Sequence, residues 1–316
     1  GVKKMVKSKS MLTEECGMNP YLEQNGIDVV ETDLGERILQ LLHQKPSHIV
    51  MPAIHLKREE VGRMFEEKGI SKHIGNYDPT YLTRCARMHL RNQFMEAGAG
   101  MTGCNFGVAE SGDIVVCTNE GNADMSTSMP KLHLVAMGIE KIVPDYSSLA
   151  VFQRLLCRSA TGQPTTAYTS HFRQARPGAE MHVILVDNGR SDILADSDHW
   201  ETLKCIRCGS CMNTCPVYRR SGGYSYTYFI PGPIGVNLGM LRNASCYSDN
   251  VSACTLCLSC DNVCPSKVGP GSQIYLWRQK LDSLHRADPM KKFMSIGMEA
   301  LFEHPHLYAA ALRLAP

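Results

Sequence analysis

The sequence lacks several features that mark common classes of protein. None of its 316 residues lie in an unbroken apolar run of about eighteen, the length needed for a membrane-spanning helix. No charged head, apolar core and cleavage site of an export signal lie near Gly1. The formal net charge is only +2, with Lys and Arg scattered, so no strong basic field is present. We therefore expect a cytoplasmic protein that is not exported, does not span a membrane and does not bind nucleic acid.

Familiar catalytic motifs are also missing. The sequence contains no P-loop, no G-x-S-x-G elbow and no H-E-x-x-H pair. The segment GAGMTG, residues 98–103, has the spacing of a dinucleotide-binding loop, but it follows a predicted helix and precedes a predicted strand. That order is the reverse of the strand and helix that hold a pyrophosphate. The context favours a tight turn over a dinucleotide loop.

Cysteine, in contrast, is abundant, with fourteen in the chain. Eight of them form two copies of the pattern C-x2-C-x2-C-x3-C-P, at 205–216 and 254–265. A disulfide framework requires an oxidising compartment, and zinc sites use separated C-x2-C pairs without a third cysteine or a Cys-Pro. The spacing is that of two [4Fe–4S] clusters, in which the fourth cysteine of each phrase binds the other cluster.

This crossed pattern predicts two ligand sets. They are Cys205, Cys208, Cys211 and Cys264 for the first cluster, and Cys254, Cys257, Cys260 and Cys215 for the second. The nearby Arg207, Arg219 and Arg220 either offset the charge of the clusters or are solvated. Six further cysteines lack ligand spacing and are predicted to be small buried apolar residues: Cys16, Cys85, Cys104, Cys117, Cys157 and Cys246.

Residues 1–197 show the alternation of strands and helices that predicts an α/β domain with a mostly parallel sheet. Asp33 is a candidate helix cap. Strands are expected at 26–30, 48–51, 113–118, 141–145 and 181–187. From about residue 198 the chain becomes rich in cysteine, glycine and proline without convincing strands, so we expect a mainly helical cluster domain at 198–290 and a helical tail at 291–316.

A polar turn follows the expected strand that ends at Thr118. Ligands of open α/β sheets bind at the carboxyl ends of strands, so this turn is a candidate pocket for a hydroxy acid or a nucleotide-like group. Its candidate residues are Asn119, Glu120, Asn122, Ser126 and Thr127. The alternative is that Asn-Glu-Gly-Asn only serves as a turn.

The stretches GMTGCNFGVAESGDIVVCTNEGNADMSTSMPKLHLVAMGIEKIVPD, TSHFRQARPGAEMHVILVDNGRSDILAD and LKCIRCGSCMNTCPVYRRSGG closely resemble the lactate-utilisation B family. These are iron–sulfur subunits of the bacterial L-lactate oxidation system. The resemblance covers nearly the whole chain. It implies a LUD domain with a ribose-5-phosphate isomerase and CoA-transferase-like fold, followed by a two-cluster ferredoxin-type domain. It also implies two partners, a cysteine-rich iron–sulfur protein and a second LUD-domain protein, and a chain truncated relative to its family. It supplies no catalytic residue.

The function expected from these observations is electron transfer in a complex that oxidises L-lactate to pyruvate. Two alternatives stay open. In the first, the α/β domain is itself an enzyme that acts on an acyl, CoA-like or nucleotide ligand. In the second, the chain is a scaffold whose aromatic loop binds partner proteins. That loop contains Tyr224, Tyr226, Tyr228 and Phe229.

Overall fold

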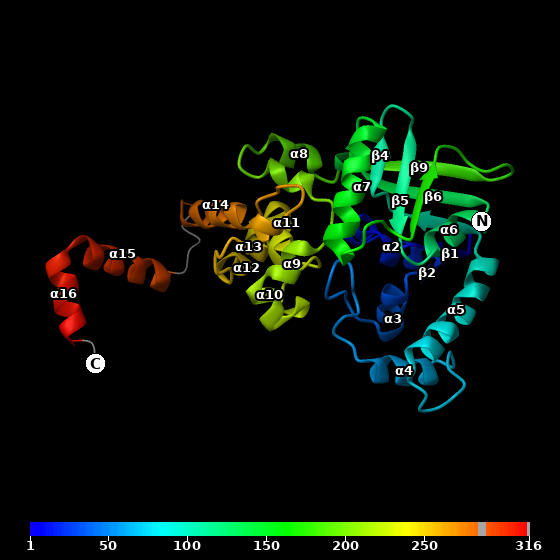
Figure 1. Cartoon of the computed structure of the whole chain (residues 1–316), viewed down its shortest axis with the longest axis horizontal. Helices are drawn as coiled ribbons and strands as arrows, with labels where there is room; N and C mark the ends of the chain where they lie inside the picture. The colour runs from blue at the N-terminus through cyan, green and yellow to red at the C-terminus, as the bar shows by residue number, and fades with distance from the viewer. Residues whose placement is uncertain (284–288, 315–316) are drawn as a thin grey trace.

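The computed structural model describes residues 1–283 and 289–314 and contains two sheets (Figure 1). The first sheet has the order β2-β1-β3-β6-β9 and is parallel throughout. Its strands are β1 (Lys4–Lys7), β2 (Asp28–Glu31), β3 (Ala99–Thr102), β6 (Leu132–Gly138) and β9 (Glu180–Val186). The second sheet, β7-β4-β5-β8, is mostly antiparallel. Its strands are β4 (Phe106–Val108), β5 (Asp113–Thr118), β7 (Ile142–Val143) and β8 (Tyr168–Phe172).

Short helices connect and cover these strands. They are α1 (Met11–Glu15), α2 (Met18–Gln24), α3 (Leu34–Leu42), α4 (Arg58–Glu67), α5 (Pro79–Glu96), α6 (Asn122–Ser128), η1 (Ile139–Lys141), α7 (Tyr146–Thr161) and α8 (Arg190–Ala195). Side-chain caps start the longer ones, since Asp78 accepts from the backbone N–H of Tyr81 at 2.9 Å and Asp145 accepts from that of Ser148 at 2.7 Å. Asp33 does occupy the N-cap position of α3, but its carboxylate makes no capping bond and instead accepts from Lys9 N.

The α/β prediction is confirmed, and four of the five expected strands appear as β2, β5, β7 and β9. The expected strand at 48–51 is wrong. His48 Nδ1 accepts from the N–H of Val50 and Met51, which turns the backbone, and Ile49 is buried against the helical region rather than in a sheet. An apolar run thus became a docking segment, which periodicity alone does not distinguish from a strand.

The GAGMTG segment is neither a tight turn nor a dinucleotide loop, because Ala99–Thr102 form β3 in the middle of the parallel sheet. The glycine within β3, Gly100, has a packing role. A Cβ on Gly100 would lie 1.7 Å from the carbonyl oxygen of Ser126, so only glycine lets α6 cross this strand so closely.

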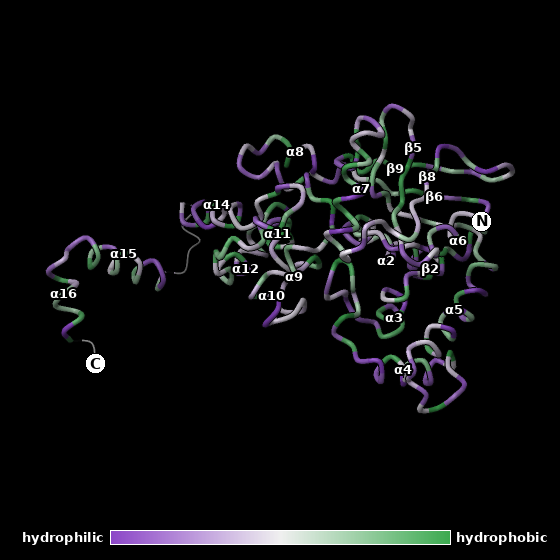
Figure 2. Tube along the Cα trace, viewed as in Figure 1, coloured by the Kyte–Doolittle hydropathy of each residue, from purple (hydrophilic) through white to green (hydrophobic). Residues whose placement is uncertain are grey.

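After β9, the described residues form helices and loops with no further strand. The elements are η2 (Trp200–Lys204), α9 (Ser210–Thr214), α10 (Pro216–Ser221), η3 (Gly223–Ser225), α11 (Gly232–Tyr247), α12 (Asp249–Ser252), α13 (Ser259–Val263), α14 (Pro270–Ser283), α15 (Pro289–Glu303) and α16 (Pro305–Leu314). The last two stand apart from the rest, contain no buried residue and alternate apolar with polar segments (Figures 1 and 2). The predicted tail ends at residues 315–316, which lie outside the described residues.

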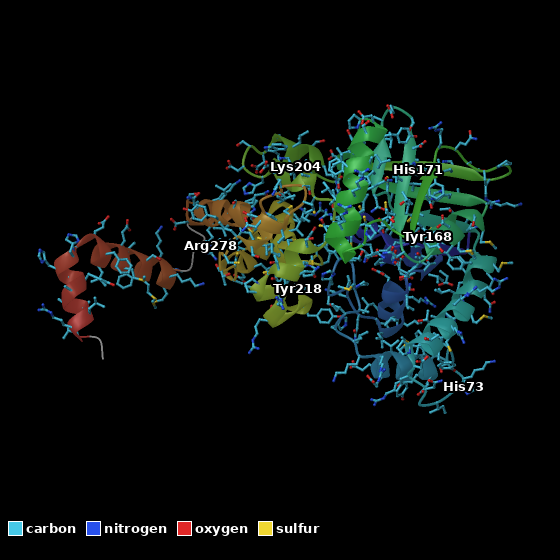
Figure 3. The ribbon with its side chains drawn as sticks, in the orientation of Figure 1. His73, Tyr168, His171, Lys204, Tyr218 and Arg278 are labelled. Atoms are coloured by element: carbon cyan, nitrogen blue, oxygen red, sulfur yellow. The ribbon has the colours of Figure 1, made fainter. Side chains whose placement is uncertain are left out.

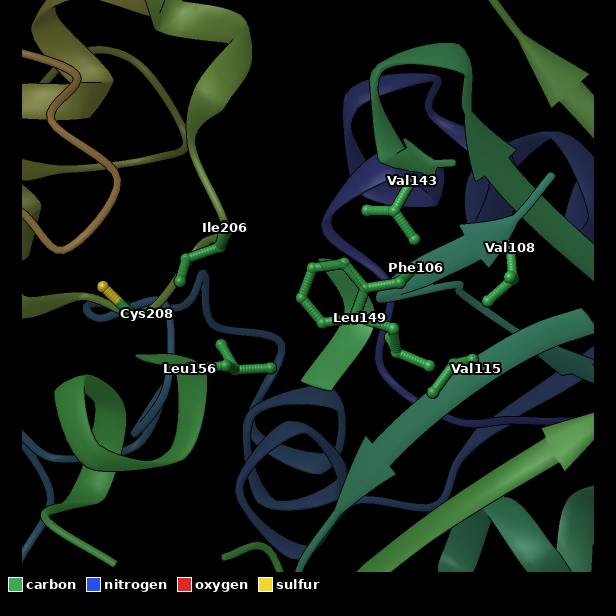
Figure 4. Close-up of a cluster of buried hydrophobic side chains, with 8 residues drawn as sticks. All are labelled: Phe106, Val108, Val115, Val143, Leu149, Leu156, Ile206 and Cys208. Atoms are coloured by element: carbon green, nitrogen blue, oxygen red, sulfur yellow. The ribbon is translucent and has the colours of Figure 1, made fainter. Parts of the chain in front are cut away.

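The helical region docks on the α/β domain through two apolar contacts. Ile49 packs with Met212 and Ile230. Ile206 joins a cluster that includes Phe106 and Leu156 (Figure 4). None of the described helices is long and apolar enough to cross a membrane.

Candidate iron–sulfur centre and the adjacent cavity

The two cysteine phrases fold alike. In the first, Arg207 and Gly209 have φ of 61° and 79°; in the second, the equivalent Leu256 and Leu258 have φ of 53° and 56°. Each loop then enters a five-residue helix, α9 or α13, and ends on a cysteine in extended conformation. Left-handed geometry at non-glycine residues requires support from the surroundings, so its repetition marks a specific loop shape rather than a random turn.

The two loops lie together. Helices α9 and α13 pack against each other, and the hydroxyls of Thr214 and Ser259 are 2.5 Å apart. Burial raises the pKa of the Cys208 thiol, and the charges of Cys205 and Cys264 raise it further. The fourth cysteine of the second phrase is therefore an electrostatic neighbour of the first phrase.

The second set of thiols is arranged in the same way. Burial raises the pKa of Cys260 to about 12, with smaller contributions from Asp261, Cys254 and Cys215. Burial likewise raises the pKa of Cys254, and the charge of Cys215 adds to the effect. Buried thiols that resist ionisation release their protons when iron binds them, so assembly of a cluster is coupled to pH and to folding.

The loops also offer donors to sulfur. The N–H of Leu256 donates to Cys254 Sγ at 3.4 Å, and that of Val268 donates to Cys264 Sγ at 3.3 Å. Such bonds stabilise thiolates and tune iron–sulfur clusters. Arg278 of α14 (Figure 3) supports the second loop by donating to the carbonyls of Val251 and Cys254. The donor set therefore fits two [4Fe–4S] clusters.

The surroundings of the loops differ. A Cβ on Gly209 would lie 3.1 Å from the ring of His48, and Ser210 donates to the carbonyl of Ser159 in α7 at 2.6 Å. The first loop is thus pressed against the α/β domain. In the second loop Cys257 is exposed and the Leu258 side chain is 43% exposed.

A cavity of about 280 Å³ lies between the parallel sheet and the first cysteine loop. Residues that follow β1, β2 and β3 line one part of it, at the carboxyl edge where parallel sheets bind ligands, and residues that follow β5 of the mostly antiparallel second sheet line the adjoining part. Asn119 and Glu120 are among them, together with Ser8, Lys9, Ser10, Asp33, Thr118 and Cys104. Burial beside Asp33 raises the pKa of Glu120.

The other three predicted pocket residues do not line this cavity. Asn122 is buried, and its Nδ2 donates to Asp33 Oδ2 at 2.8 Å and to Thr32 Oγ1 at 3.1 Å. Ser126 is fully buried. Thr127 lines a separate cavity beside Pro130 and Phe172. Asn122 and Ser126 therefore lie beneath the wall of the cavity, and Thr127 lies outside it.

Two cations lie at the cluster end: Lys141, which the sequence did not indicate, and Arg207, which was expected either to offset the cluster charge or to be solvated. Lys141 ends η1, and its Nζ donates to the carbonyl of Cys205 at 2.9 Å. Burial lowers the pKa of Lys141, and the charge of Arg207 lowers it further. Arg207 lines the same cavity, whereas Arg219 and Arg220 are exposed on α10. Lys141 lies three residues after the end of β6 and at the start of the expected strand 141–145, so no local signal in the sequence marks it as a site residue.

The aromatic loop packs on the protein itself. Tyr228 is buried beside Tyr247, and the Tyr224 hydroxyl donates to the carbonyl of Lys45 at 2.7 Å. Of the six cysteines predicted to be buried, Cys157 is buried and Cys104, Cys117 and Cys85 are partly buried, but the prediction is wrong for Cys16 and Cys246, which are exposed.

Comparison with known proteins identifies the two regions. Residues 1–193 match the LUD domain family, and residues 201–268 match the 4Fe-4S dicluster domain family. Lactate utilization protein B of Shouchella clausii is 42% identical over 99% of this chain and 67% of its own length. The chain belongs to the lactate utilization protein B family. The expected LUD domain is confirmed, and so are two [4Fe–4S] clusters as cofactors.

Other family relatives agree. Lactate utilization protein B of Geobacillus thermodenitrificans is 43% identical over 99% of this chain and 67% of its own length. An uncharacterized electron transport protein of Escherichia coli, YkgF, is 44% identical over 88% of this chain and 59% of its own length. The chain thus spans between 59% and 67% of the length of these relatives. No solved structure matches it.

Proposed function

We propose that the chain is the electron-transfer iron–sulfur subunit of a cytoplasmic complex that oxidises L-lactate to pyruvate. The observation that carries the proposal is the pair of like-folded cysteine loops, packed through α9 and α13 so that the last cysteine of each phrase neighbours the other phrase. Two closely spaced clusters are suited to passing electrons one at a time.

The proposed ligands follow the crossed pattern. Cys205, Cys208, Cys211 and Cys264 hold the first cluster, and Cys254, Cys257, Cys260 and Cys215 hold the second. The electrostatic effect of Cys264 on Cys208, and of Cys215 on both Cys254 and Cys260, supports this assignment, and the effect of Cys260 on Cys211 places the two ligand sets next to each other. Each bound cluster supplies a one-electron carrier. The chain's own residues bury the sulfurs and donate N–H groups to Cys254 and Cys264.

Partners complete the proposed complex. Oxidation of lactate to pyruvate releases two electrons and two protons, and the clusters take the electrons one each. We assign the oxidation itself to the complex, which includes a cysteine-rich iron–sulfur protein and a second LUD-domain protein. The names of the relatives, which refer to lactate utilization and electron transport, support this role.

Anaerobic reconstitution tests the proposal. About eight iron and about eight sulfide per chain are expected, with an EPR signal after dithionite reduction. Lactate should reduce these clusters only when the partners are present. Bound zinc, or half the iron, counts against the two-cluster assignment. If dithionite reduces the clusters but lactate does not reduce them even with the partners present, the role in lactate oxidation is contradicted.

Double variants test which cysteines share a cluster. If the ligands are crossed, Cys208→Ser with Cys264→Ser damages one cluster and leaves about four iron, whereas Cys257→Ser with Cys264→Ser damages both. Uncrossed ligands give the reverse result. Cys246→Ser is the matched control, since Cys246 is exposed and lies outside both phrases, and it should keep all the iron.

A further inference from the structure

The cavity beside the first cysteine loop combines two parts of the fold. One wall combines the carboxyl edge of the parallel sheet, with Ser8 and Asp33, and the end of β5 in the second sheet, with Glu120. The other wall contains Ile206 and Arg207 from between two cysteines of the first phrase. Leu156 of α7 lies close to Ile206 on this side (Figure 4). A ligand in the cavity therefore contacts the LUD domain and the loop of the first cluster at once.

Two cations, Lys141 and Arg207, line this end of the cavity. Glu140 Oε1 is 4.0 Å from Lys141 Nζ, and Arg190 binds the other oxygen, Oε2, at 2.5 Å. Among the described residues no carboxylate pairs with Arg207, and its Nη1 is buried without an acceptor. A buried N–H group of a guanidinium without an acceptor is costly, which indicates that another group completes the site.

The second cysteine phrase provides an internal comparison. Leu256 stands where the first phrase has Arg207, with nearly the same backbone conformation, and it packs against apolar residues around Trp277. The loop shape therefore needs no cation at this position. An arginine placed there, with donors facing a cavity, is suited to a planar carboxylate.

We propose that this cavity binds a small organic acid anion, with its carboxylate held by Arg207 and Lys141 and its remaining polar groups facing the carboxyl edge of the sheet. The hydroxyl-bearing Ser8 and Ser10 and the carboxylate of Asp33 line that edge, and Glu120 lines the cavity from the end of β5. These groups suit a hydroxyl or a protonated group. The ligand class is a 2-hydroxy or 2-oxo acid. The inference deepens the proposed function, because it places the electron donor or its product beside the first cluster.

Calorimetric titration of the anaerobic, cluster-loaded protein tests binding apart from electron transfer. The probes are L-lactate and pyruvate, with lactamide as the uncharged analogue and inorganic phosphate as a different anion. We expect binding of a carboxylate probe, none of lactamide and weaker binding of phosphate. Phosphate binding as tight as that of both acids would overturn the ligand class, and no binding of either acid would overturn the site.

Variants test the role of Arg207. Arg207→Leu installs the residue that the second phrase uses and should weaken binding about 10- to 100-fold, the loss of a charged hydrogen bond. Arg207→Lys should lie between that variant and the wild type. Arg220→Leu makes the same change on the exposed surface of α10 and should bind normally.

Iron content and dithionite reduction are measured in parallel, so a failed cluster is not confused with a failed site. Arg207→Leu with full iron, a shifted potential and unchanged affinity would show that Arg207 only offsets the cluster charge, and the proposal would be wrong. Normal binding without lactate-dependent reduction in the presence of partners would instead contradict the proposed function while the site stands.

Discussion

Ile206→Ala is the most direct perturbation of the contact between the two domains. Ile206 lies between two cysteines of the first phrase, yet its side chain is only 8% exposed and packs with Phe106 and Leu156 of the LUD domain (Figure 4). The change removes three carbons at about 0.8 kcal/mol each, or about 2.4 kcal/mol, and the unfilled space adds to this loss. We expect a total of about 2–4 kcal/mol.

The assay is anaerobic urea unfolding of the cluster-loaded protein, followed by visible absorbance of the clusters and by far-UV circular dichroism. With a slope of about 3 kcal/mol per M, a loss of about 3 kcal/mol lowers the midpoint by about 1 M. Both signals should shift, because the same side chain anchors the cluster loop and fills the LUD core.

Thr255→Ala is the matched control, because Thr255 occupies the equivalent position of the second phrase and is exposed. Its effect should stay below about 0.5 kcal/mol. Equal midpoints for Ile206→Ala and Thr255→Ala would refute the docking role of Ile206.

Two further predictions concern the LUD domain. Burial lowers the pKa of His133, which lies beside Thr102, to about 4. As the pH falls, the unfolded chain therefore takes up a proton near pH 6.5, before the folded chain does. The free energy of unfolding is unaffected above that pH and falls by up to about 1.4 kcal/mol per pH unit toward pH 4. His133→Gln should flatten urea midpoints measured between pH 7 and 5, and an unchanged slope would contradict this. Gly100→Ala should lower the melting temperature strongly, because the added Cβ would lie 1.7 Å from the carbonyl oxygen of Ser126. Gly297→Ala should not, because open space surrounds Gly297. Equal melting temperatures of the two variants would disprove the close crossing of α6 over β3.

The sequence predicted the parts of this structure that depend on local chemistry. The cysteine spacing indicated both clusters, because each set of three ligands lies within seven residues of the chain. The strand at 181–187 was predictable from its β-branched residues. The segment 48–51 was not, since Ile49 is buried by residues more than 150 positions away, such as Met212, while Met51 is exposed.

The same limit applies to the cavity. Asn119 and Glu120 could be placed there because the end of one strand was visible in the sequence. Lys141 and Arg207 come from different domains, and nothing local in the chain indicates that the first cysteine loop docks beside η1. Their meeting depends on tertiary packing, which sequence periodicity does not encode.

The two cysteine loops differ in solvent exposure, and this difference gives the proposed electron transfer a direction. The first loop is held against the LUD domain by Gly209 and Ser210, while Leu258 and Cys257 of the second face solvent in the described chain. Under the proposed function, electrons from a molecule in the cavity reach the cluster at the first loop, which the LUD domain covers. A partner redox protein then accepts them at the exposed second loop without displacing the LUD domain. The order in which the two clusters are reduced and reoxidised then follows from which cysteine loop the LUD domain covers.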